Sequence, residues 1–345
     1  MNLSGSDYFL LFTASLVLVG ILTPVMRKIA VTFDVVDNPG ESHKTHRMPI
    51  PYLGGLAIAL GIVIVSYGTT LLSHFSSSNF WLATSVLLPG IFLSIIGLID
   101  DIKKLSPWPR FLAQNFVGLI SALILISTST LGKPTGSLFF DVVITVLWIV
   151  GLTNAINFFD NIDGGASGSV AVSSLFIAIL AIRGNQYLIG ALAIVISGAT
   201  LGFLIWNRPP ARIYMGDAGS LFLGLLIASL TIRLEPNPIN QYASFAVPIL
   251  LVAVPIMDTS VVVLKRISRG ISPFQGGTDH LSHRLMRSGL SKRQAVISLW
   301  LLSAFFASLA LVLSNAPYRW EGFIALAATV AWLCAFFFFA KLPDS

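Results

Sequence analysis

The sequence predicts an all-α, polytopic membrane protein, and three observations carry that prediction. Hydrophobic residues make up 55% of the 345-residue chain, charged residues make up only 10%, and the mean hydropathy is +0.85. Soluble domains of ordinary composition carry about a quarter charged residues. Several apolar runs reach the roughly 20 residues that a helix needs to cross about 30 Å of hydrocarbon. Basic residues, finally, gather in alternate loops between these runs.

Apolar runs separated by Gly, Pro and charged residues predict about eleven transmembrane helices. No repeat of roughly 20–50 residues and no low-complexity linker divides the chain, so we expect a single integral membrane domain over residues 1–345. The expected helices, in chain order, are 7–30, 53–72, 80–99, 109–128, 137–158, 165–182, 186–205, 217–233, 242–264, 294–314 and 318–340.

The first apolar run predicts a retained span and not a cleaved signal peptide, because it ends in Met26-Arg27-Lys28 instead of small residues. Cys334 is the one cysteine, which excludes an intrachain disulfide and a cysteine-based metal site. The net charge of +6 does not indicate nucleic-acid binding. A basic excess in a membrane protein usually sets its topology, and no basic–aromatic groove motif is present.

The distribution of Lys and Arg predicts the orientation of the chain. If the eleven helices alternate, one side of the membrane holds the C-terminus and the loops 27–52, 100–110, 154–164, 206–216 and 265–293. That side carries 17 of the 21 Lys and Arg residues, and the other side carries four. The positive-inside rule then places the basic side in the cytoplasm and the N-terminus outside.

The acidic residues gather on the same side. Eleven of the 15 Asp and Glu residues lie in these cytoplasmic loops or at helix ends that face them. A transporter is expected to place ionisable groups near the midplane of its bundle. The crowding of acids at the cytoplasmic mouth therefore favours an active site on cytoplasmic loops that handles a cytosolic substrate at the membrane surface.

The pair Asp100-Asp101 ends a predicted helix in the stretch GLIDDIKKLSPWPR. Adjacent carboxylates repel each other, which raises their pKa unless a cation lies beside them. Helix C-termini also prefer cations, so solubilisation of a helix end is a poor explanation for two acids. The pair indicates a Mg²⁺ site or a base, with Lys103, Lys104 and Arg110 available for phosphate.

Asn154, Asn157, Asp160 and Asp163 recur every third residue in NAINFFDNIDG, directly after an apolar run. At about 100° per residue, this spacing keeps the four side chains on one slowly drifting stripe of a helix. Oxygen-rich stripes suit hard cations and the edges of nucleobases. Hydrogen bonding between helices is the alternative explanation.

Asp217 lies among Gly, Ala and Ser residues in RPPARIYMGDAGSLFLG, just before a predicted helix. Small residues let backbone amides approach an anion at a helix N-terminus. A carboxylate at this place is suited to hold a metal that bridges phosphates. A simple N-cap is the alternative.

Two further motifs on the same side combine imidazole and cationic groups. GGTDHLSHRLMRSGLS carries His280, His283 and Arg284, and HKTHRMPIP carries Lys44 and His46. This density of His, Arg and Lys suits phosphate or pyrophosphate recognition. Contact with anionic lipid is the alternative.

Taken together, the motifs favour phosphoryl transfer, which needs Mg²⁺ and Arg or Lys clamps. In this order they closely resemble those of the polyprenyl-phosphate N-acetylhexosamine-1-phosphate transferases of glycosyltransferase family 4. The resemblance covers nearly the whole chain, from HKTHRMPIPYLGG through DDIKKLSP, NAINFFDNIDG and RIYMGDAGSLFLG to DHLSHRLMRSGLS. It implies an enzyme that transfers a sugar-1-phosphate from a UDP-sugar to a polyprenyl phosphate and releases UMP, with Mg²⁺ as cofactor and Mn²⁺ as an alternative metal.

The resemblance also implies roles for individual residues. Asp217 would be the main metal ligand, with Asn157 a second. Tyr214 would stack on uracil, and Asp163 would contact the uracil edge. Catalytic roles are expected for Asp100 (as candidate base), Asp101, Asp217, His280 and His283. Substrate-binding roles are expected for Lys44, His46, Arg110, Asn154, Asp160, Asp163, Tyr214 and Arg284.

Two positions depart from the family's pattern. The common last motif reads His-x-His-His, whereas Ser282 replaces one imidazole here. A role that needs that imidazole cannot be carried over, although Arg284 would supply the lost charge. Asn161 stands where many members have Gly in Asp-Gly-x-Asp-Gly, so it would narrow the turn or add a hydrogen bond.

The chain lacks the acid-bearing His-His ending of the MurNAc-pentapeptide enzymes, which favours a UDP-GlcNAc donor. We therefore expect transfer of GlcNAc-1-phosphate to undecaprenyl phosphate in the plasma (inner) membrane of a bacterium. Such a reaction initiates cell-envelope polysaccharides such as lipopolysaccharide or teichoic acid. Two alternative functions stay open at this point: phospho-MurNAc-pentapeptide transfer, and non-enzymatic transport of nucleotide sugar or lipid phosphate. Assembly as a homodimer also stays open.

Overall fold

The structure is a computed structural model that describes residues 3–37, 49–72, 77–127, 135–236, 238–273 and 276–344. Thirteen helices and a two-stranded antiparallel sheet are found in these residues. The strands are β1 (Val36–Asp37) and β2 (Ile50–Pro51). The helices are α1 (Gly5–Thr32), α2 (Gly54–Leu72), α3 (Ser77–Lys103), α4 (Pro107–Ser127), α5 (Leu138–Phe159), α6 (Gly165–Arg183), α7 (Tyr187–Asn207), α8 (Gly216–Arg233), α9 (Gln241–Leu251), α10 (Ala253–Ser268), α11 (Leu281–Arg287), α12 (Lys292–Ser314) and α13 (Tyr318–Lys341).

Ten of the described helices are long and apolar enough to cross a membrane, and the bent pair α9 and α10 would make an eleventh span. The prediction of an all-α, multi-pass membrane protein with about eleven spans is thereby confirmed. Two helix starts carry reciprocal caps: Ser4 with Asp7 begins α1, and Ser291 with Gln294 begins α12. In such a capping box, each side chain accepts a hydrogen bond from the other residue's backbone amide.

The prediction of one continuous helix over 242–264 is wrong, because this stretch forms two helices, α9 and α10, that meet at an angle of 80°. Pro255 explains where the break falls: its ring would clash with the carbonyl of Leu251, four residues earlier, in a continuous helix. The Leu251 carbonyl instead accepts a 2.6 Å hydrogen bond from Ser173 Oγ on α6. A side chain from a neighbouring helix thus satisfies a backbone group that the break leaves open, as a membrane interior requires.

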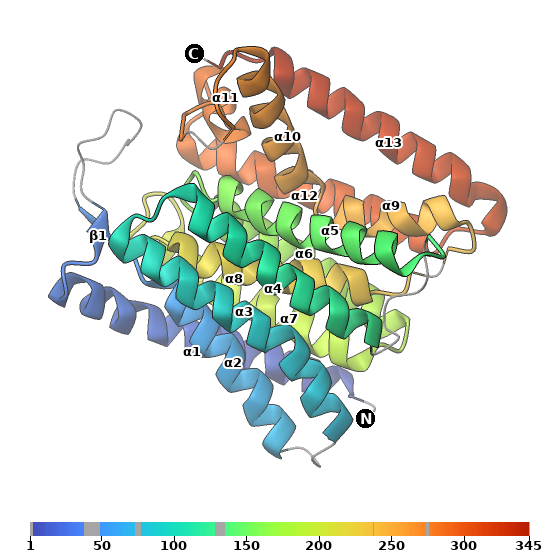
Figure 1. Cartoon of the computed structure of the whole chain (residues 1–345), viewed down its shortest axis with the longest axis horizontal. Coiled ribbons are helices and arrows are strands. Elements are labelled where there is room, and N and C mark those ends of the chain that lie inside the picture. Colours follow the sequence, from blue (N-terminus) through green and yellow to red (C-terminus); the bar gives the residue numbers. More distant parts are fainter. Residues whose placement is uncertain are drawn as a thin grey trace.

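Helix α8 is the central helix of the bundle. In the most apolar 18-residue window of each helix, 83% of the residues of α8 are buried, against 11% for α13. Figure 1 shows α1 and α2 along one side of the bundle and α12 and α13 along the opposite side. Helix α3 packs closely on α8, because Gly97 lies against the backbone of Asp217, where a Cβ would overlap the Asp217 carbonyl. A small residue at this contact therefore brings the acidic end of α3 to the start of α8.

Candidate active site

A polar pocket of about 310 Å³ lies where the ends of several helices meet. Its walls come from the loops and helix ends that carry most of the Lys and Arg residues. Five of its lining residues are aspartates, and Lys292 is the one Lys or Arg among them. The lining residues are Asp37, Tyr52, Asp101, Asn157, Asp160, Asn161, Ile162, Asp163, Asn207, Tyr214, Gly216, Asp217, His283, Met286 and Lys292.

Asp101, at the end of α3, holds the first turn of α8. Its Oδ1 accepts a 2.8 Å hydrogen bond from the amide of Asp217, and its Oδ2 accepts a 3.1 Å bond from the amide of Ala218. The N-cap residue of α8, Met215, provides no side-chain cap. Gly216 has φ of +70°, and a Cβ there would meet the Asp101 carboxylate, so both conformation and space demand glycine. Asp101 therefore caps a helix from a distant segment and fixes Asp217.

Asp217 is held by two further side chains. Asn157 Nδ2 donates a 2.8 Å hydrogen bond to Asp217 Oδ1 and another of 2.8 Å to Ser220 Oγ. Arg110 Nη1 on α4 donates to Asp217 Oδ2 and, at 2.7 Å, to Asp100 Oδ2. Arg110 thus joins the ends of α3, α4 and α8 around one carboxylate. A guanidinium has five N–H donors, so Arg110 keeps donors for a phosphate besides the two bonds that it makes here.

Asp163 ties the turn after α5 to two other segments. Its Oδ2 accepts a 2.9 Å bond from the amide of Ala211 and forms a 2.8 Å ion pair with Lys292 Nζ. Asn207 supports the same turn by accepting a 2.9 Å bond from the amide of Gly164. Asp163 and Asn207 therefore connect the turn after α5 to the loop before α8, to the end of α7 and to the start of α12.

Among the acids that line the pocket, Asp160 is the one whose negative charge is least stabilised by neighbouring groups. Burial raises the pKa of the Asp160 carboxyl well above its ordinary value, and the charges of Asp217, Asp101 and Asp163 raise it further. A carboxyl in this situation gains stability from a nearby cation.

Two tyrosines form one wall, with ring centroids of Tyr52 and Tyr214 lying 6.1 Å apart. Burial, and next the charge of Asp37, raise the pKa of the Tyr52 hydroxyl; burial and Asp163 do the same for the pKa of Tyr214. Both hydroxyls are therefore protonated donors at neutral pH. The amide of Tyr214 donates a 2.9 Å bond to the Pro51 carbonyl, which anchors this ring to β2. The wall offers aromatic surface to a base, while stacking of uracil on Tyr214 stays a prediction.

Most of the predicted site residues meet at this pocket. Asp100 and Arg110 lie directly beside it through their contacts with each other and with Asp217. Lys44 and His46 lie outside the described residues. The predicted residues that line the pocket are Asp101, Asn157, Asp160, Asp163, Tyr214, Asp217 and His283.

Three further predicted residues neither line the pocket nor contact Asp217. Asn154 faces the helix bundle, where its Nδ2 donates at 2.5 Å to Gln114 Oε1. His280 is buried, with its Nδ1 lying 2.7 Å from Asp258 Oδ2 on α10. The Arg284 side chain is 0% exposed and binds the C-terminal end of the described chain. It donates a 2.9 Å hydrogen bond to the Leu342 carbonyl and a 3.0 Å bond to the Asp344 carboxylate. None of the three side chains lines this pocket, so the substrate contacts expected of Asn154 and Arg284 and the catalytic role expected of His280 stay predictions.

The lining residues that were not among the predicted site residues include Asp37, Tyr52, Asn207 and Lys292. A signal for Lys292 was present in the sequence, because it is the first residue of a helix capped by Ser291. A cation there opposes the helix dipole and needs another reason to be present. The other three follow from tertiary packing, which brings β1, the start of α2 and the end of α7 to one place.

The oxygen ligands at the pocket suit a divalent cation only if a substrate adds to them. In the described part of the chain, no three His, Cys, Asp or Glu side chains could together hold a metal ion. Mg²⁺, however, is usually bound by one or two carboxylates together with substrate phosphates and water. Asp101 holds two backbone amides of α8, whereas each oxygen of Asp217 accepts from one side chain, Asn157 or Arg110. A side-chain donor can turn away more easily than a helix amide, so a cation would bind at Asp217, with Asp160 as the second carboxylate. Asn157 turns its amide nitrogen to Asp217, so as placed it orients that carboxylate. The residues fit Mg²⁺ with phosphate as co-ligand.

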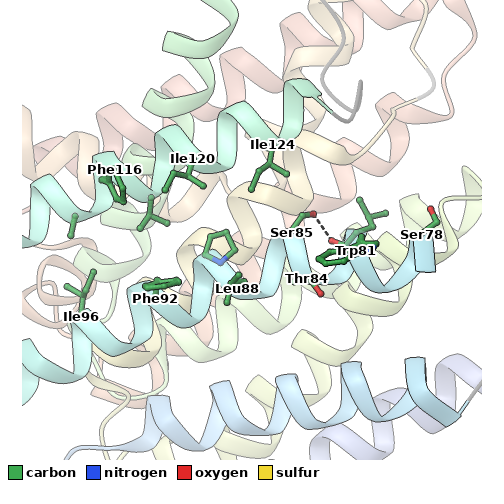
Figure 2. A pocket seen from close by; sticks show the side chains of 14 residues that line it. Ser78, Trp81, Thr84, Ser85, Leu88, Phe92, Ile96, Phe116, Ile120 and Ile124 are labelled. Carbon is green, nitrogen blue, oxygen red and sulfur yellow. Dashed lines mark hydrogen bonds between the residues drawn. The ribbon is translucent and has the colours of Figure 1, made fainter. Parts of the chain in front are cut away.

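An apolar groove of about 780 Å³ runs between α3 and α4. Figure 2 shows Phe92 and Ile96 on α3 facing the same space as Phe116 on α4. The Ile96 end of the groove lies one helical turn before Asp100. The groove therefore leads along the two helices to the Asp100–Arg110 pair beside the polar pocket.

Comparisons with known proteins agree with this arrangement. A sequence profile described as "Glycosyl transferase family 4" matches residues 83–235, a range that contains both Asp100-Asp101 and Asp217. The chain is 34% identical to a "Probable undecaprenyl-phosphate N-acetylglucosaminyl 1-phosphate transferase" of Bacillus subtilis (strain 168), over 88% of this chain and 84% of the relative. It is 32% identical to a "Decaprenyl-phosphate N-acetylglucosaminephosphotransferase" of Mycolicibacterium smegmatis, over 80% and 74% of the two chains.

A third relative carries a different donor in its name. The "Phospho-N-acetylmuramoyl-pentapeptide-transferase" of Halalkalibacterium halodurans is 29% identical over 88% of this chain and 94% of the relative. With identities above 30% across most of the chain, and the acidic motifs meeting in one pocket, this multi-pass membrane protein belongs to glycosyl transferase family 4.

Proposed function

We propose that the protein transfers GlcNAc-1-phosphate from UDP-GlcNAc to undecaprenyl phosphate and releases UMP. The observation that carries the proposal is the meeting of two binding spaces. Asp101 lines the polar pocket, while its neighbour Asp100 and the partner Arg110 stand at the end of the apolar groove. A lipid whose tail fills the groove would present its phosphate to a nucleotide sugar in the pocket. The names of the first relatives point to the same reaction.

The chain's own residues suit this displacement. An oxygen of the lipid phosphate attacks the phosphorus next to the sugar; a P–O bond forms there, and the P–O bond to UMP breaks, its electron pair leaving with UMP. A lipid phosphate is already largely anionic at neutral pH, so the step needs no strong base. Arg110 and Lys292 lie where they would stabilise negative charge on the two phosphates.

We further propose Mg²⁺ as the cofactor, with Mn²⁺ as a substitute. Asp217 and Asp160 would hold it, with Asn157 orienting Asp217. When bound, the metal neutralises the charge of the pyrophosphate.

The test uses the purified full-length protein in nanodiscs with undecaprenyl phosphate, Mg²⁺ and a panel of UDP-sugars, and it measures UMP release. We expect lipid-dependent release that EDTA abolishes and added Mg²⁺ restores. Asp217→Asn should lower turnover by about 10²–10³-fold, since the carboxylate that would hold the metal loses its charge. Asp34→Asn is the matched control: this exposed acid at the end of α1 has φ of 55°, which Asn adopts readily. Near-normal turnover of Asp217→Asn would remove the metal assignment.

The panel also separates the alternatives. The pentapeptide-transferase name of one relative keeps UDP-MurNAc-pentapeptide as the second candidate donor. Preference for that donor would move the protein to peptidoglycan synthesis. Binding or vesicle uptake of a nucleotide sugar without UMP release would instead support a transporter and overturn the transferase proposal.

A further inference from the structure

The two positions that depart from the family's pattern touch each other. Ser282 Oγ on α11 lies 2.5 Å from Asn161 Oδ1 in the turn after α5, although 121 residues separate them in the chain. Ser282 is fully buried, whereas Asn161 lines the polar pocket. Ser282, which stands in place of a histidine, and Asn161, which stands in place of a glycine, are therefore hydrogen-bonded to each other.

The direction of this hydrogen bond follows from the surroundings of Asn161. Its other amide atom lies 2.8 Å from the Phe158 carbonyl. A carbonyl oxygen only accepts, so the atom facing it must be the NH₂ group. Asn161 consequently turns its oxygen to Ser282, and the single hydroxyl proton of Ser282 is donated to that oxygen.

A third side chain continues the chain of contacts. His283 Nδ1 lies 3.3 Å from Ser282 Oγ. Because the Ser282 proton is already donated to Asn161, this contact is favourable only when Nδ1 carries the proton and Ser282 Oγ accepts it. The neutral ring then has its lone pair on Nε2. His283 itself lines the pocket.

The surroundings of His283 determine its charge. Burial, and next His280, lower the pKa of His283 to about 4; Arg287 lowers it as well, while Asp258 and Asp279 act in the opposite direction. The imidazole is therefore neutral at pH 7, and it does not bind phosphate as a cation.

We propose that Asn161 and Ser282 are positioning residues that hold His283 as its Nδ1–H tautomer, so that Nε2 accepts a hydrogen bond from a hydroxyl or amide N–H of the donor sugar. The identity of the ligand rests on the proposed function, whereas the tautomer does not. An acceptor at this place would favour sugars that present a donor group toward α11.

The tautomer is tested directly by ¹⁵N NMR of the full-length protein in nanodiscs, with selectively labelled histidine. The chain has five His residues, and a His283→Gln variant assigns the signal. We expect a neutral ring protonated at Nδ1 in the wild type at pH 7. In Asn161→Ala the Ser282 proton loses its acceptor and turns to His283, so the Nε2–H form should grow. Ser282→Ala should give a mixture of tautomers. Ser288→Ala, whose hydroxyl bonds only to the Arg284 carbonyl of its own helix, is the control.

Kinetics then tests the ligand. Ser282→Ala should raise the KM for the sugar nucleotide by about fivefold, the effect of one neutral hydrogen bond. Inhibition by UMP should stay unchanged, because UMP has ribose but lacks the transferred sugar that His283 would contact. An Nε2–H or cationic His283 in the wild type, or a tautomer that ignores Asn161→Ala, overturns the proposal. Equal weakening of UMP overturns the sugar contact. If no donor releases UMP, the proposed function fails, while the NMR result still decides the tautomer.

Discussion

Asp101 Oδ1 accepts a 2.8 Å hydrogen bond from the backbone amide of Asp217. With its second oxygen on the amide of Ala218, the carboxylate of Asp101 is fully used in holding the start of α8. The two acids at the end of α3 therefore have different structural roles. Asp101 positions Asp217 through the backbone. Asp100 positions Arg110 through a 2.7 Å ion pair of its Oδ2, while its Oδ1 accepts a 2.7 Å bond from the amide of Leu105 just after α3.

These roles predict different effects for the two acids. Asp101→Ala should lower the free energy of unfolding by about 1–3 kcal/mol, since it leaves buried helix amides without an acceptor. Asp101→Asn should be intermediate, because one carbonyl oxygen is retained. Asp100→Ala should reduce UMP release with a smaller loss of stability, because it leaves the cap of α8 in place. Thermal unfolding in detergent and UMP release measure both effects; equal destabilisation by Asp100→Ala and Asp101→Ala would contradict this difference in roles.

The groove between α3 and α4 leads to a prediction about the lipid substrate. Ile120→Trp should fill the groove and raise the KM for undecaprenyl phosphate by about tenfold, while the KM for the UDP-sugar stays unchanged, because lost apolar contact costs on the order of 1 kcal/mol. Leu123→Trp is the matched control, since Leu123 is an exposed residue of the same helix that does not line the groove. Equal KM changes for the two substrates, or equal effects of the two variants, would speak against the lipid path.

Arg284 is predicted to act on stability and not on substrate binding. Its buried guanidinium serves the carbonyls of Asp279 and Leu342 and the carboxylate of Asp344. Arg284→Ala should lower the unfolding free energy by about 2–4 kcal/mol, because it leaves several buried acceptors without a donor. The KM for the UDP-sugar, measured per folded molecule, should stay within about twofold of wild type.

Arg287→Ala is the control for Arg284, because Arg287 is exposed on the same helix and bonds only to Thr278. Thermal unfolding and resistance of the C-terminal end to protease report the loss. A large KM change in folded Arg284→Ala would restore the substrate-binding role that the motif first suggested.

Sequence patterns were sufficient for the spans and for the acids, because apolar run length and charge asymmetry act locally. They were insufficient where a distant partner decides the outcome. The break between α9 and α10 could have been suspected from Pro255, yet it depends on Ser173 to satisfy the Leu251 carbonyl. The use of Arg284 on the end of α13 depends on tertiary contacts that no local pattern contains. Motif density therefore indicated the loops that meet at the polar pocket, but it could not say which of their residues line it.

The contact between Asn161 and Ser282 predicts that the two positions change together. Ser282 is fully buried at 2.5 Å from Asn161, so Ser282→His adds an imidazole where there is no space, an overpacking that typically costs about 1–3 kcal/mol. Asn161→Gly alone removes the acceptor of the Ser282 proton. In the double variant Asn161→Gly with Ser282→His, the loss of the Asn161 side chain leaves the volume that the imidazole needs. The double variant also has the residues of the family's pattern at both positions.

A double-mutant cycle measures this coupling through thermal unfolding and UMP release. We expect the double variant to be more stable than the sum of the single changes predicts by at least about 1 kcal/mol, and to release UMP faster than Ser282→His alone. Ser288→His in the Asn161→Gly background is the control, because Ser288 is exposed and bonds only to its own helix. Additive effects at 161 and 282 would mean that the two departures from the family pattern are independent, and the contact would then carry no functional coupling.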